Sequence, residues 1–336
     1  MSKVILVTGG AGYIGSHACK ALARAGYEPV AYDNLGRGHR EAVRWGPLVE
    51  GELADRALLV RTLRRFDIAT VMHFAAFAYV GESVAKPALY FENNVANSLN
   101  LFAAMLEAGV KRIVFSSTCA TYGIPDKMPI DESAPQQPVN PYGESKLMIE
   151  RMLHWLGQGD GLRHVALRYF NAAGADPDAE IGENHDPETH LIPLLLLTAL
   201  GRRDAIDVFG TDYPTPDGTA IRDYIHVKDL AEAHVAALEH LGGGGDSLAL
   251  NLGTGRGHSV REAISAAERV TGRPVAWRAA PRRVGDPPVL VADARRAAAL
   301  LGWTPRLSAL DEIIGTAWAW HRKRHALLAP SAPSPA

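Results

Sequence analysis

Short apolar runs alternate with helical patterns in the first half of the chain. The apolar runs are 4–8, 29–33, 70–74, 112–116 and 165–169, and a helical pattern at about 15–25 follows the first of them. Such alternation predicts parallel strands that are joined by crossover helices. The runs are apolar almost throughout, as is required of a sheet covered by helices on both faces. We therefore predict an α/β fold with a doubly wound parallel sheet.

The second half of the chain differs from the first in composition. Beyond Asn171 it is rich in Gly, Pro and Asp, and a similar loop spans 210–218. The apolar run 191–200 has about half of the roughly 20 residues that a bilayer span needs, so it predicts a core helix, beginning near Pro193. Helical periodicity returns in three later segments, 229–240, 259–270 and 293–301, after which the chain ends in a Pro-rich tail. These features predict a smaller, loop-rich α/β lobe.

A glycine-rich turn follows the first predicted strand. Gly9, Gly12 and Gly15 form a Gly-x-x-Gly-x-x-Gly spacing between that strand and a helix. Glycine lets the backbone approach a pyrophosphate, and the amides and dipole at a helix N-terminus favour the anion. The strand 29–33 ends in Asp33, whose carboxylate can bind an adenosine ribose and repels a 2′-phosphate. These residues predict a Rossmann-type dinucleotide site that prefers NAD to NADP.

Charge and composition exclude several classes of partner. The formal net charge of −2 gives no electrostatic reason to expect a nucleic acid or a membrane surface. The first residues run into an apolar strand without a basic leader or a cleavage site, so we expect a cytoplasmic protein. Cys19 and Cys119 are the only cysteines and lie far apart, and we expect both to stay reduced, outside any metal cage.

A phenol and an ammonium share one face of a predicted helix. Tyr142 and Lys146 stand four residues apart, directly after Pro141 at the expected helix start. A free tyrosine has a pKa of about 10, and a neighbouring cation lowers that pKa because it stabilises the phenolate. Thr118 follows the strand 112–116 and can bring its hydroxyl to the same place. The three residues predict proton transfer beside the dinucleotide.

Several stretches between Lys3 and Trp320 match a known family pattern. They are 7–17, 33–35, 80–84, 93–95, 168–171, 218–227 and 281–286, and the tract 212–219 leading into Arg222 is the most specific of all. On these stretches the chain resembles the extended short-chain dehydrogenase/reductase family and, within it, the UDP-glucose 4-epimerases. The resemblance covers nearly the whole chain.

The resemblance implies NAD-dependent interconversion of UDP-glucose and UDP-galactose. Tyr142, as phenolate, would remove the proton of the sugar 4-hydroxyl while hydride passes to the nicotinamide, which gives a 4-keto sugar. The sugar would then turn over, take hydride back on its opposite face and regain the proton from Tyr142. Lys146 would bind the nicotinamide ribose and tune Tyr142, and Thr118 would aid proton transfer.

The resemblance also assigns binding residues. For NAD they are Gly9, Gly12, Tyr13, Ile14, Gly15, Asp33, Asn34, Glu52, Leu53, Phe74, Ala75, Ala76, Asn93, Tyr142, Lys146 and Phe170. For the UDP-sugar they are Thr118, Tyr142, Asn171, His190, Leu191, Phe209, Arg222, Arg283 and Asp286. Guanidinium groups such as those of Arg222 and Arg283 match phosphate oxygens.

Some positions depart from the family pattern or invite another interpretation. Glu52 stands where the family usually has Asp, although it can still bind adenine, and 75–78 lack a lysine that some members place near the cofactor phosphate. Leu290 is bulky near a position that gates an N-acetyl group, which favours plain hexoses. His185 and His190 have no third residue at a spacing typical of zinc ligands, so we expect no metal.

The length of 336 residues predicts more than one lobe. We assign 1–175, joined by about 220–250, to an NAD-binding Rossmann domain. We assign 176–219 and 251–325 to a nucleotide-sugar-binding lobe, and 326–336 to a frayed tail. A homodimer is expected from the resemblance, through helices at about 94–108 and 145–156.

Three other functions share some of these features. A nucleotide-sugar 4,6-dehydratase would carry an acidic pair directly after its active-site Thr, where this chain has Cys119 and Ala120. A 4-epimerase of a UDP-pentose or a UDP-N-acetylhexosamine would keep every catalytic group and change only the pocket lining. An NAD-sensing regulatory protein would keep the glycine turn and lose the catalytic residues. The presence of Thr118, Tyr142 and Lys146 argues against that function.

Overall fold

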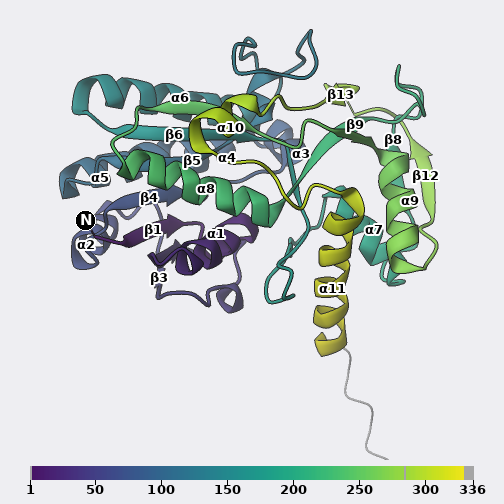
Figure 1. Ribbon diagram of the computed structural model, residues 1–336, viewed down its shortest axis with the longest axis horizontal. Helices are drawn as coiled ribbons and strands as arrows, with labels where there is room; N and C mark the ends of the chain where they lie inside the picture. The colour runs from purple at the N-terminus through teal and green to yellow at the C-terminus, as the bar shows by residue number, and fades with distance from the viewer. Residues whose placement is uncertain (1, 284, 329–336) are drawn as a thin grey trace, which may run out of the picture.

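A seven-stranded parallel sheet lies at the centre of the larger lobe (Figure 1). The computed structural model describes residues 2–283 and 285–328. The strand order is β10-β6-β5-β4-β1-β2-β3. The strands are β1 (Val4–Thr8), β2 (Glu28–Asp33), β3 (Leu48–Glu50), β4 (Thr70–His73), β5 (Arg112–Thr118), β6 (Arg163–Tyr169) and β10 (Leu248–Leu252). All five apolar runs are strands, which confirms the predicted α/β fold.

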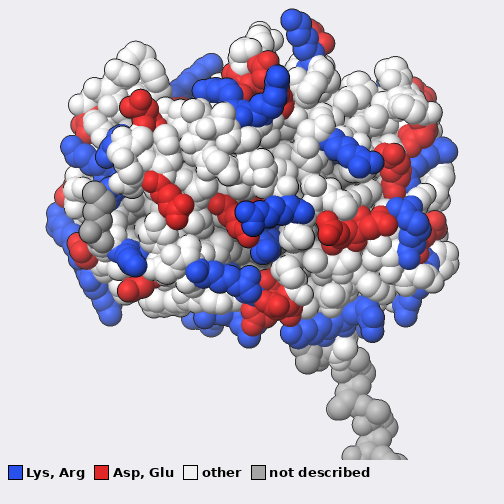
Figure 2. All heavy atoms as spheres, in the orientation of Figure 1, with Lys and Arg blue, Asp and Glu red and all other residues white. Residues whose placement is uncertain are grey.

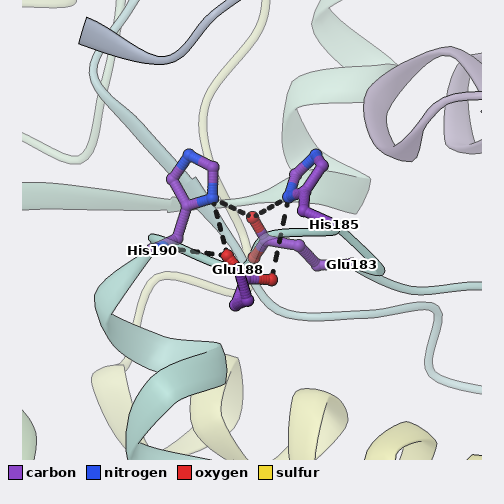
Figure 3. Close-up of side chains that lie close together, drawn as sticks. All are labelled: Glu183, His185, Glu188 and His190. Carbon is purple, nitrogen blue, oxygen red and sulfur yellow. Dashed lines mark hydrogen bonds and ion pairs between the residues drawn. The ribbon is translucent and has the colours of Figure 1, made fainter. Parts of the chain in front are cut away.

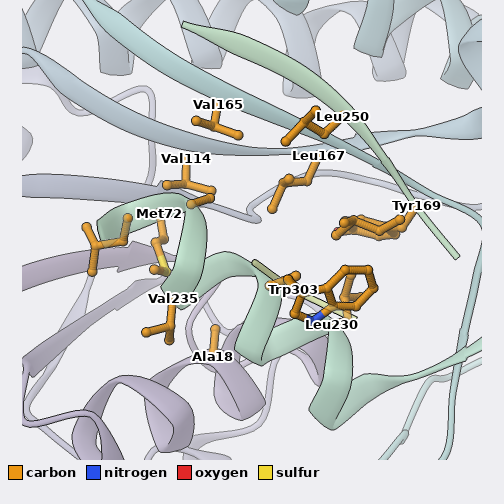
Figure 4. Close-up of a cluster of buried hydrophobic side chains, with 14 of the residues drawn as sticks. Ala18, Met72, Val114, Val165, Leu167, Tyr169, Leu230, Val235, Leu250 and Trp303 are labelled. Atoms are coloured by element: carbon orange, nitrogen blue, oxygen red, sulfur yellow. The ribbon is translucent and has the colours of Figure 1, made fainter. Parts of the chain in front are cut away.

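Helices cover both faces of this sheet. On one face lie α1 (Tyr13–Arg24), α8 (Val227–Gly242) and α10 (Arg295–Leu301), and on the other lie α2 (Arg56–Arg65), α5 (Asn97–Ala108) and α6 (Pro141–Asp160). Within β1, Ile5 and Val7 join the apolar cluster under α1 and α8, whereas Leu6 joins the cluster on the opposite face. Figure 4 shows part of the first cluster, with Ala18 of α1 and Val235 of α8 facing strand residues such as Val114. Because successive strand residues point to opposite faces, both sets must be apolar. This is why the strands read as continuous apolar runs.

The second half of the chain adds two smaller sheets. Strand β9 (Ile221–His226) pairs with β7 (Asn171–Ala173), β11 (Gly257–Ser259) and β13 (Val289–Leu290), and β8 (Ile206–Phe209) pairs with β12 (Trp277–Ala280). Three helices pack around them: α7 (Leu191–Ala199), α9 (Val260–Thr271) and α11 (Leu310–Leu328). The remaining short elements are η1 (Arg40–Ala42), α3 (Val80–Ala85), α4 (Pro87–Tyr90), the π-helix η2 (Phe91–Ala96) and η3 (Cys119–Tyr122).

Two boundaries differ from those predicted. The core helix begins at Leu191 rather than near Pro193, since proline is compatible with the first helical turn. Residues 326–328 continue α11, so the tail expected from 326 onward is wrong for these three residues, and 329–336 lie outside the described residues. The Pro-rich composition begins only after the helix ends, which explains the difference.

None of the helices within residues 2–283 and 285–328 combines the length and the apolar composition of a membrane-spanning segment.

Strands β1 and β4 are neighbours in the sheet but are not consecutive in the chain. From β1 the chain builds outward through β2 to β3, and it then returns to the other side of β1 to continue with β4, β5 and β6. In open parallel sheets, ligands bind at the carboxyl ends of the strands where the direction of winding reverses. The carboxyl ends of β1 and β4 are therefore where this fold positions a site.

A buried ion pair fastens α6 to the sheet. The guanidinium of Arg168 on β6 binds the carboxylate of Glu150 on α6, and both side chains are over 90% buried. Ser117 on β5 also donates to Glu150, and Arg168 donates to the hydroxyl of Tyr122 at 2.9 Å. Each charge is therefore paired and hydrogen-bonded, which is the condition for burying charge without a large penalty.

We expect Arg168→Leu to lower the free energy of unfolding by about 3–5 kcal/mol, because it leaves the buried carboxylate of Glu150 without its cation. Urea unfolding followed by circular dichroism measures the change. The matched control is Arg269→Leu, which breaks the exposed pair with Asp311 and should cost less than about 1 kcal/mol. Equal losses in the two variants would contradict the interpretation.

Candidate active site

The glycine turn at the end of β1 allows very close backbone approach. Gly9 has φ +72°, and a Cβ there would lie 2.7 Å from the backbone N of Ala75. A Cβ on Gly15 would lie 2.1 Å from the carbonyl oxygen of Gly9. Helix α1 starts at Tyr13 with Gly12 as its N-cap, and within the described residues no side chain caps it. The turn thus keeps the helix N-terminus, including Tyr13 and Ile14, free of side-chain acceptors, which fits a pyrophosphate.

Asp33 at the end of β2 is bound to this turn. Its carboxylate accepts hydrogen bonds from the backbone N–H groups of Ala11 at 3.0 Å and Leu35 at 2.8 Å. Burial raises the pKa of Asp33, and these two hydrogen bonds oppose that rise. Next to it, Asn34 donates to both oxygens of Glu52 at 3.1 and 3.0 Å, and the buried Leu53 follows. The residues expected at the adenosine end of NAD therefore lie together.

The end of β4 is attached to the end of β1. The backbone N–H groups of Phe74 and Ala75 both donate to the carbonyl oxygen of Thr8, at 2.9 and 3.1 Å. This contact sets Ala75, and Ala76 after it, directly beside the glycine turn. Asn93 lies in the π-helix η2, where its amide donates to the Asn94 side chain, and Asn94 in turn donates to Ser145 on α6. Such π-helical turns often occur at functional sites.

The start of α6 brings Tyr142 to Thr118. Pro141 is the first helical residue, and the side chain of Asn140 accepts a hydrogen bond from Gly143 N at 2.9 Å. A Cβ on Gly143 would lie 2.5 Å from the carbonyl oxygen of Ala120, so glycine permits α6 to approach η3 closely. Thr118 is the N-cap of η3 and lies at the carboxyl end of β5. Its hydroxyl lies close enough to the Tyr142 phenol to lower the pKa of that phenol.

Burial dominates the protonation of the Tyr142 and Lys146 pair. Burial raises the pKa of Tyr142 to about 12, although the hydrogen bond from Thr118 opposes this. Burial lowers the pKa of Lys146 to about 7, although the negative charge of Glu150 opposes this. The Lys146 ammonium donates a hydrogen bond to the Ser116 carbonyl at 2.8 Å. Burial is the largest influence on the pKa of Tyr142, so the direction of its shift is upward, and the tuning of Tyr142 by Lys146 stays a prediction. Desolvation exceeds the effect of an ammonium whose own charge is destabilised.

A small apolar cluster forms the wall beside Thr118. Phe170, just after β6, is buried with Cys119 and Tyr122 of η3, and Leu290 of β13 packs against the same cluster. Leu290 thus packs against the cluster that contains the residue after Thr118, and its gating role stays a prediction. Asn171 begins β7 immediately after Phe170.

The expected phosphate and uracil residues gather on the smaller sheets. Arg222 of β9 forms an ion pair with Asp286. The guanidinium of Arg283 stacks on the Phe209 ring, 4.0 Å from its centre. Stacked or paired guanidinium groups are fixed in orientation, which suits them to a planar base and to phosphate oxygens.

The surroundings of His190 differ from the sequence interpretation. His190 is the N-cap of α7, directly before Leu191, and its Nδ1 contacts Glu183 at 2.9 Å and Glu188 at 3.0 Å. His185 contacts the same two glutamates. The sequence interpretation considered only the spacing of the histidines and did not include the two glutamates. The pattern Glu-x-His-x-x-Glu-x-His over 183–190 could have indicated that the four residues belong together. The fold turns this loop so that all four side chains converge.

Comparison with known proteins agrees with this geometry. Residues 5–253 match the model of the NAD dependent epimerase/dehydratase family. The UDP-glucose 4-epimerase of Rhizobium leguminosarum bv. trifolii is 54% identical over 321 residues, which cover 96% of this chain and 98% of that protein.

Two solved structures show the same fold over almost their full lengths. UDP-glucose 4-epimerase from Brucella ovis, in complex with NAD, is 55% identical with a TM-score of 0.92 and covers 94% of this chain and 97% of its own. UDP-glucose 4-epimerase from Stenotrophomonas maltophila, with bound NAD and formylated UDP-arabinopyranose, is 42% identical with a TM-score of 0.93 and covers 96% and 99%. On this evidence the chain belongs to the NAD-dependent epimerase/dehydratase family.

Proposed function

We propose that the protein is an isomerase that interconverts UDP-glucose and UDP-galactose through a 4-keto-hexose, with NAD as a recycled cofactor. The observation that carries the proposal is that Tyr142, in the first turn of α6, and Thr118, at the carboxyl end of β5, lie close enough for Thr118 to affect the pKa of the Tyr142 phenol. This end of the sheet is also where Gly9 and Asp33 form the dinucleotide turn. Relatives at about half identity over nearly the whole chain support the same activity.

The residues of the chain divide the work between binding and proton transfer. Bound NAD would supply the acceptor and donor of hydride. Gly9, Gly12 and Gly15 would bind its pyrophosphate, and Asp33 its adenosine ribose. Tyr142 would take the proton of the sugar 4-hydroxyl through a hydrogen bond shared with Thr118, and it would return the proton to the same oxygen afterwards.

The electrostatics of the site support a base that is formed only when the site is loaded. With a pKa of about 12, Tyr142 is neutral at pH 7 in the protein without ligand. A positive charge on bound nicotinamide, placed beside the phenol, would stabilise the phenolate. Proton removal is thereby coupled to the oxidised form of the cofactor.

The substrate side of the proposal rests on two arginines. Arg222, paired with Asp286, and Arg283, stacked on Phe209, would bind the diphosphate and the uridine. Asn171, His190 and Leu191 would complete the nucleotide-sugar contacts. The proposed division into an NAD-binding part and a nucleotide-sugar-binding lobe agrees with β10, which joins the large sheet, and with β8 and β12, which form a separate pair. It does not describe β7 and β9, which pair with β11 and β13 in a smaller sheet, or α10, which packs on the large sheet.

The choice among related activities depends on the wall beside Thr118. Cys119 and Ala120 follow Thr118 in η3, so the acidic pair of a 4,6-dehydratase is missing there. Leu290 fills space against Cys119 and Phe170, which favours a plain hexose over an N-acetylhexosamine. A 4-epimerase of another UDP-sugar is the second candidate, because the same catalytic groups would serve it.

The surface supports a soluble homodimer rather than a nucleic-acid or membrane partner. Positive and negative side chains are interspersed over the face in Figure 2, so that face has no wide region of positive charge to attract a polyanion. Exposed apolar side chains gather on neighbouring helices: Val84 on α3, Leu99 on α5, and Met148 and Trp155 on α6. Such a patch typically marks a protein interface. The cytoplasmic location stays a prediction.

We expect Tyr142→Phe to lower turnover of UDP-galactose by about 10² or more while NAD stays bound, because the variant keeps the ring and loses the proton-transfer group. A coupled assay of UDP-glucose and release of NAD on denaturation measure the two quantities. Tyr27→Phe, in the connection between α1 and β2, is the matched control and should retain activity. Bound NAD in the wild type without turnover on any UDP-sugar would instead favour the NAD-sensing alternative.

We expect apoprotein refolded with NADP to stay inactive, whereas NAD restores activity. Both oxygens of Asp33 are already committed to backbone amides, so the carboxylate cannot turn away from a 2′-phosphate. Reconstitution at equal concentrations of the two dinucleotides measures the difference. Comparable recovery with NADP would argue against this role of Asp33.

We expect Leu99→Glu, alone or with Met148→Glu, to shift the protein from dimer to monomer, because a charge in an apolar interface must be desolvated. Sedimentation velocity measures the shift. Leu300→Glu on α10 is the matched control, since Leu300 is 45% exposed and Leu99 49%. If the wild type sediments as a monomer, or if Leu300→Glu has the same effect, the assignment of this interface fails.

A further inference from the structure

Four metal-ligand side chains converge in the loop before α7. Figure 3 shows His185 and His190 with their Nδ1 atoms directed at the carboxylates of Glu183 and Glu188. At least one ligand atom of each residue lies within 4.8 Å of those of the other three. The four side chains come from only eight consecutive residues, 183–190, so the loop itself builds the arrangement.

The nitrogen–oxygen distances in this cluster are close to the ligand spacing of a tetrahedral cation site, with His190 facing Oε1 of Glu188 and His185 facing Oε2. The four nitrogen–oxygen distances are 2.9 and 3.0 Å from His190 and 3.2 and 3.7 Å from His185. Zinc bonds of about 2.0–2.1 Å in a tetrahedron place neighbouring ligand atoms roughly 3.4 Å apart. Only small side-chain adjustments would therefore be needed to hold a cation between them.

The hydrogen bonding of the cluster leaves room for such a cation. Nδ1 of His185 is closed off from solvent, yet it makes no hydrogen bond of good geometry within the described residues. Glu183 is 5% exposed and Glu188 10%, and the rings of Tyr13 and Tyr79 lie against the imidazoles. Two buried carboxylates with two imidazoles carry two negative charges when the imidazoles are neutral, which one divalent cation would balance.

The chemistry of the ligands selects among cations. Two imidazole nitrogens and two carboxylate oxygens suit Zn²⁺, whereas Mg²⁺ and Ca²⁺ prefer oxygen ligands and higher coordination numbers. A second acidic cluster, Asp176, Asp178 and Glu180, offers a contrast. There the ammonium of Lys20 already binds all three carboxylates, at 2.7, 3.0 and 2.7 Å. Lys20 thus supplies the positive charge at that cluster.

We propose that Glu183, His185, Glu188 and His190 form a four-coordinate site for a divalent transition-metal ion of the zinc type. Four protein ligands leave no open position for a substrate, so the site is structural rather than catalytic. It would fasten the loop 183–190 next to Tyr13 of the glycine turn and to the N-terminus of α7. His190 would bind the cation through Nδ1, which leaves its Nε2 for the nucleotide-sugar contact proposed above. The test measures metal binding rather than epimerase activity.

In the absence of a cation, protons balance the same charges. Burial opposes protonation of His185, but Glu183 and Glu188 outweigh it and raise the pKa of His185 to about 9. The same two carboxylates raise the pKa of His190 to about 10 against burial. A metal must displace these protons, so binding is best measured above neutral pH.

The test is metal binding by the full-length protein with its dinucleotide retained, after treatment with a chelator, at pH 8. Zn²⁺ is titrated in competition with a chromophoric chelator, and Co²⁺ is used as a spectroscopic probe. We expect one Zn²⁺ per chain, the intense visible bands of tetrahedral Co²⁺ and no competition from excess Mg²⁺ or Ca²⁺. We also expect zinc to raise the melting temperature.

Variants separate this site from adventitious binding. His185→Gln and Glu188→Gln each remove one ligand and should weaken Zn²⁺ binding by about 100-fold, with loss of the tetrahedral Co²⁺ bands. Asp178→Asn in the second acidic cluster and His154→Gln on the exposed surface are the matched controls and should leave binding unchanged. Less than stoichiometric binding by the wild type, or unchanged affinity in both ligand variants, would overturn the proposal.

Discussion

The close approach of backbone segments at the carboxyl ends of β1, β4 and β5 is the constraint on which the site depends. Glycine is needed at Gly9 and Gly15 because a side chain would collide with backbone within 3 Å, and Gly143 meets the same restriction against Ala120. These contacts bring the start of α1, the end of β4 and the start of α6 to one edge of the sheet. The dinucleotide turn and the Tyr142 phenol are neighbours for this reason.

Tight packing around the reacting groups also governs their electrostatics. An argument from spacing treats Tyr142 and Lys146 as an isolated pair in which the cation favours the phenolate. In the folded protein both groups are desolvated, so each is shifted toward its neutral form. Burial in the fold keeps the phenol protonated, Thr118 opposes this in part, and a positive charge on bound nicotinamide would oppose it further.

Much of the fold was predictable because it rests on local patterns. Strands buried on both faces are apolar runs, and α6 begins where Pro141 and the Asn140 cap indicate. The short strand β3 was not predicted because its three residues show no clear period. The convergence of Glu183 and Glu188 on the histidines was missed because it depends on how an irregular loop turns. The gathering of Arg222, Asp286, Phe209 and Arg283 was expected only from the family resemblance, because these residues lie far apart in sequence.

Helix α6 joins two features that are otherwise unrelated. Tyr142 stands in its first turn, and Trp155, 71% exposed, lies thirteen residues further along. At 1.5 Å per residue the helix forms a rod of roughly 20 Å between them, which the Arg168–Glu150 pair anchors midway. The exposed indole and the phenol therefore belong to one continuous helix. Any displacement of this helix as a rigid unit would move both groups together.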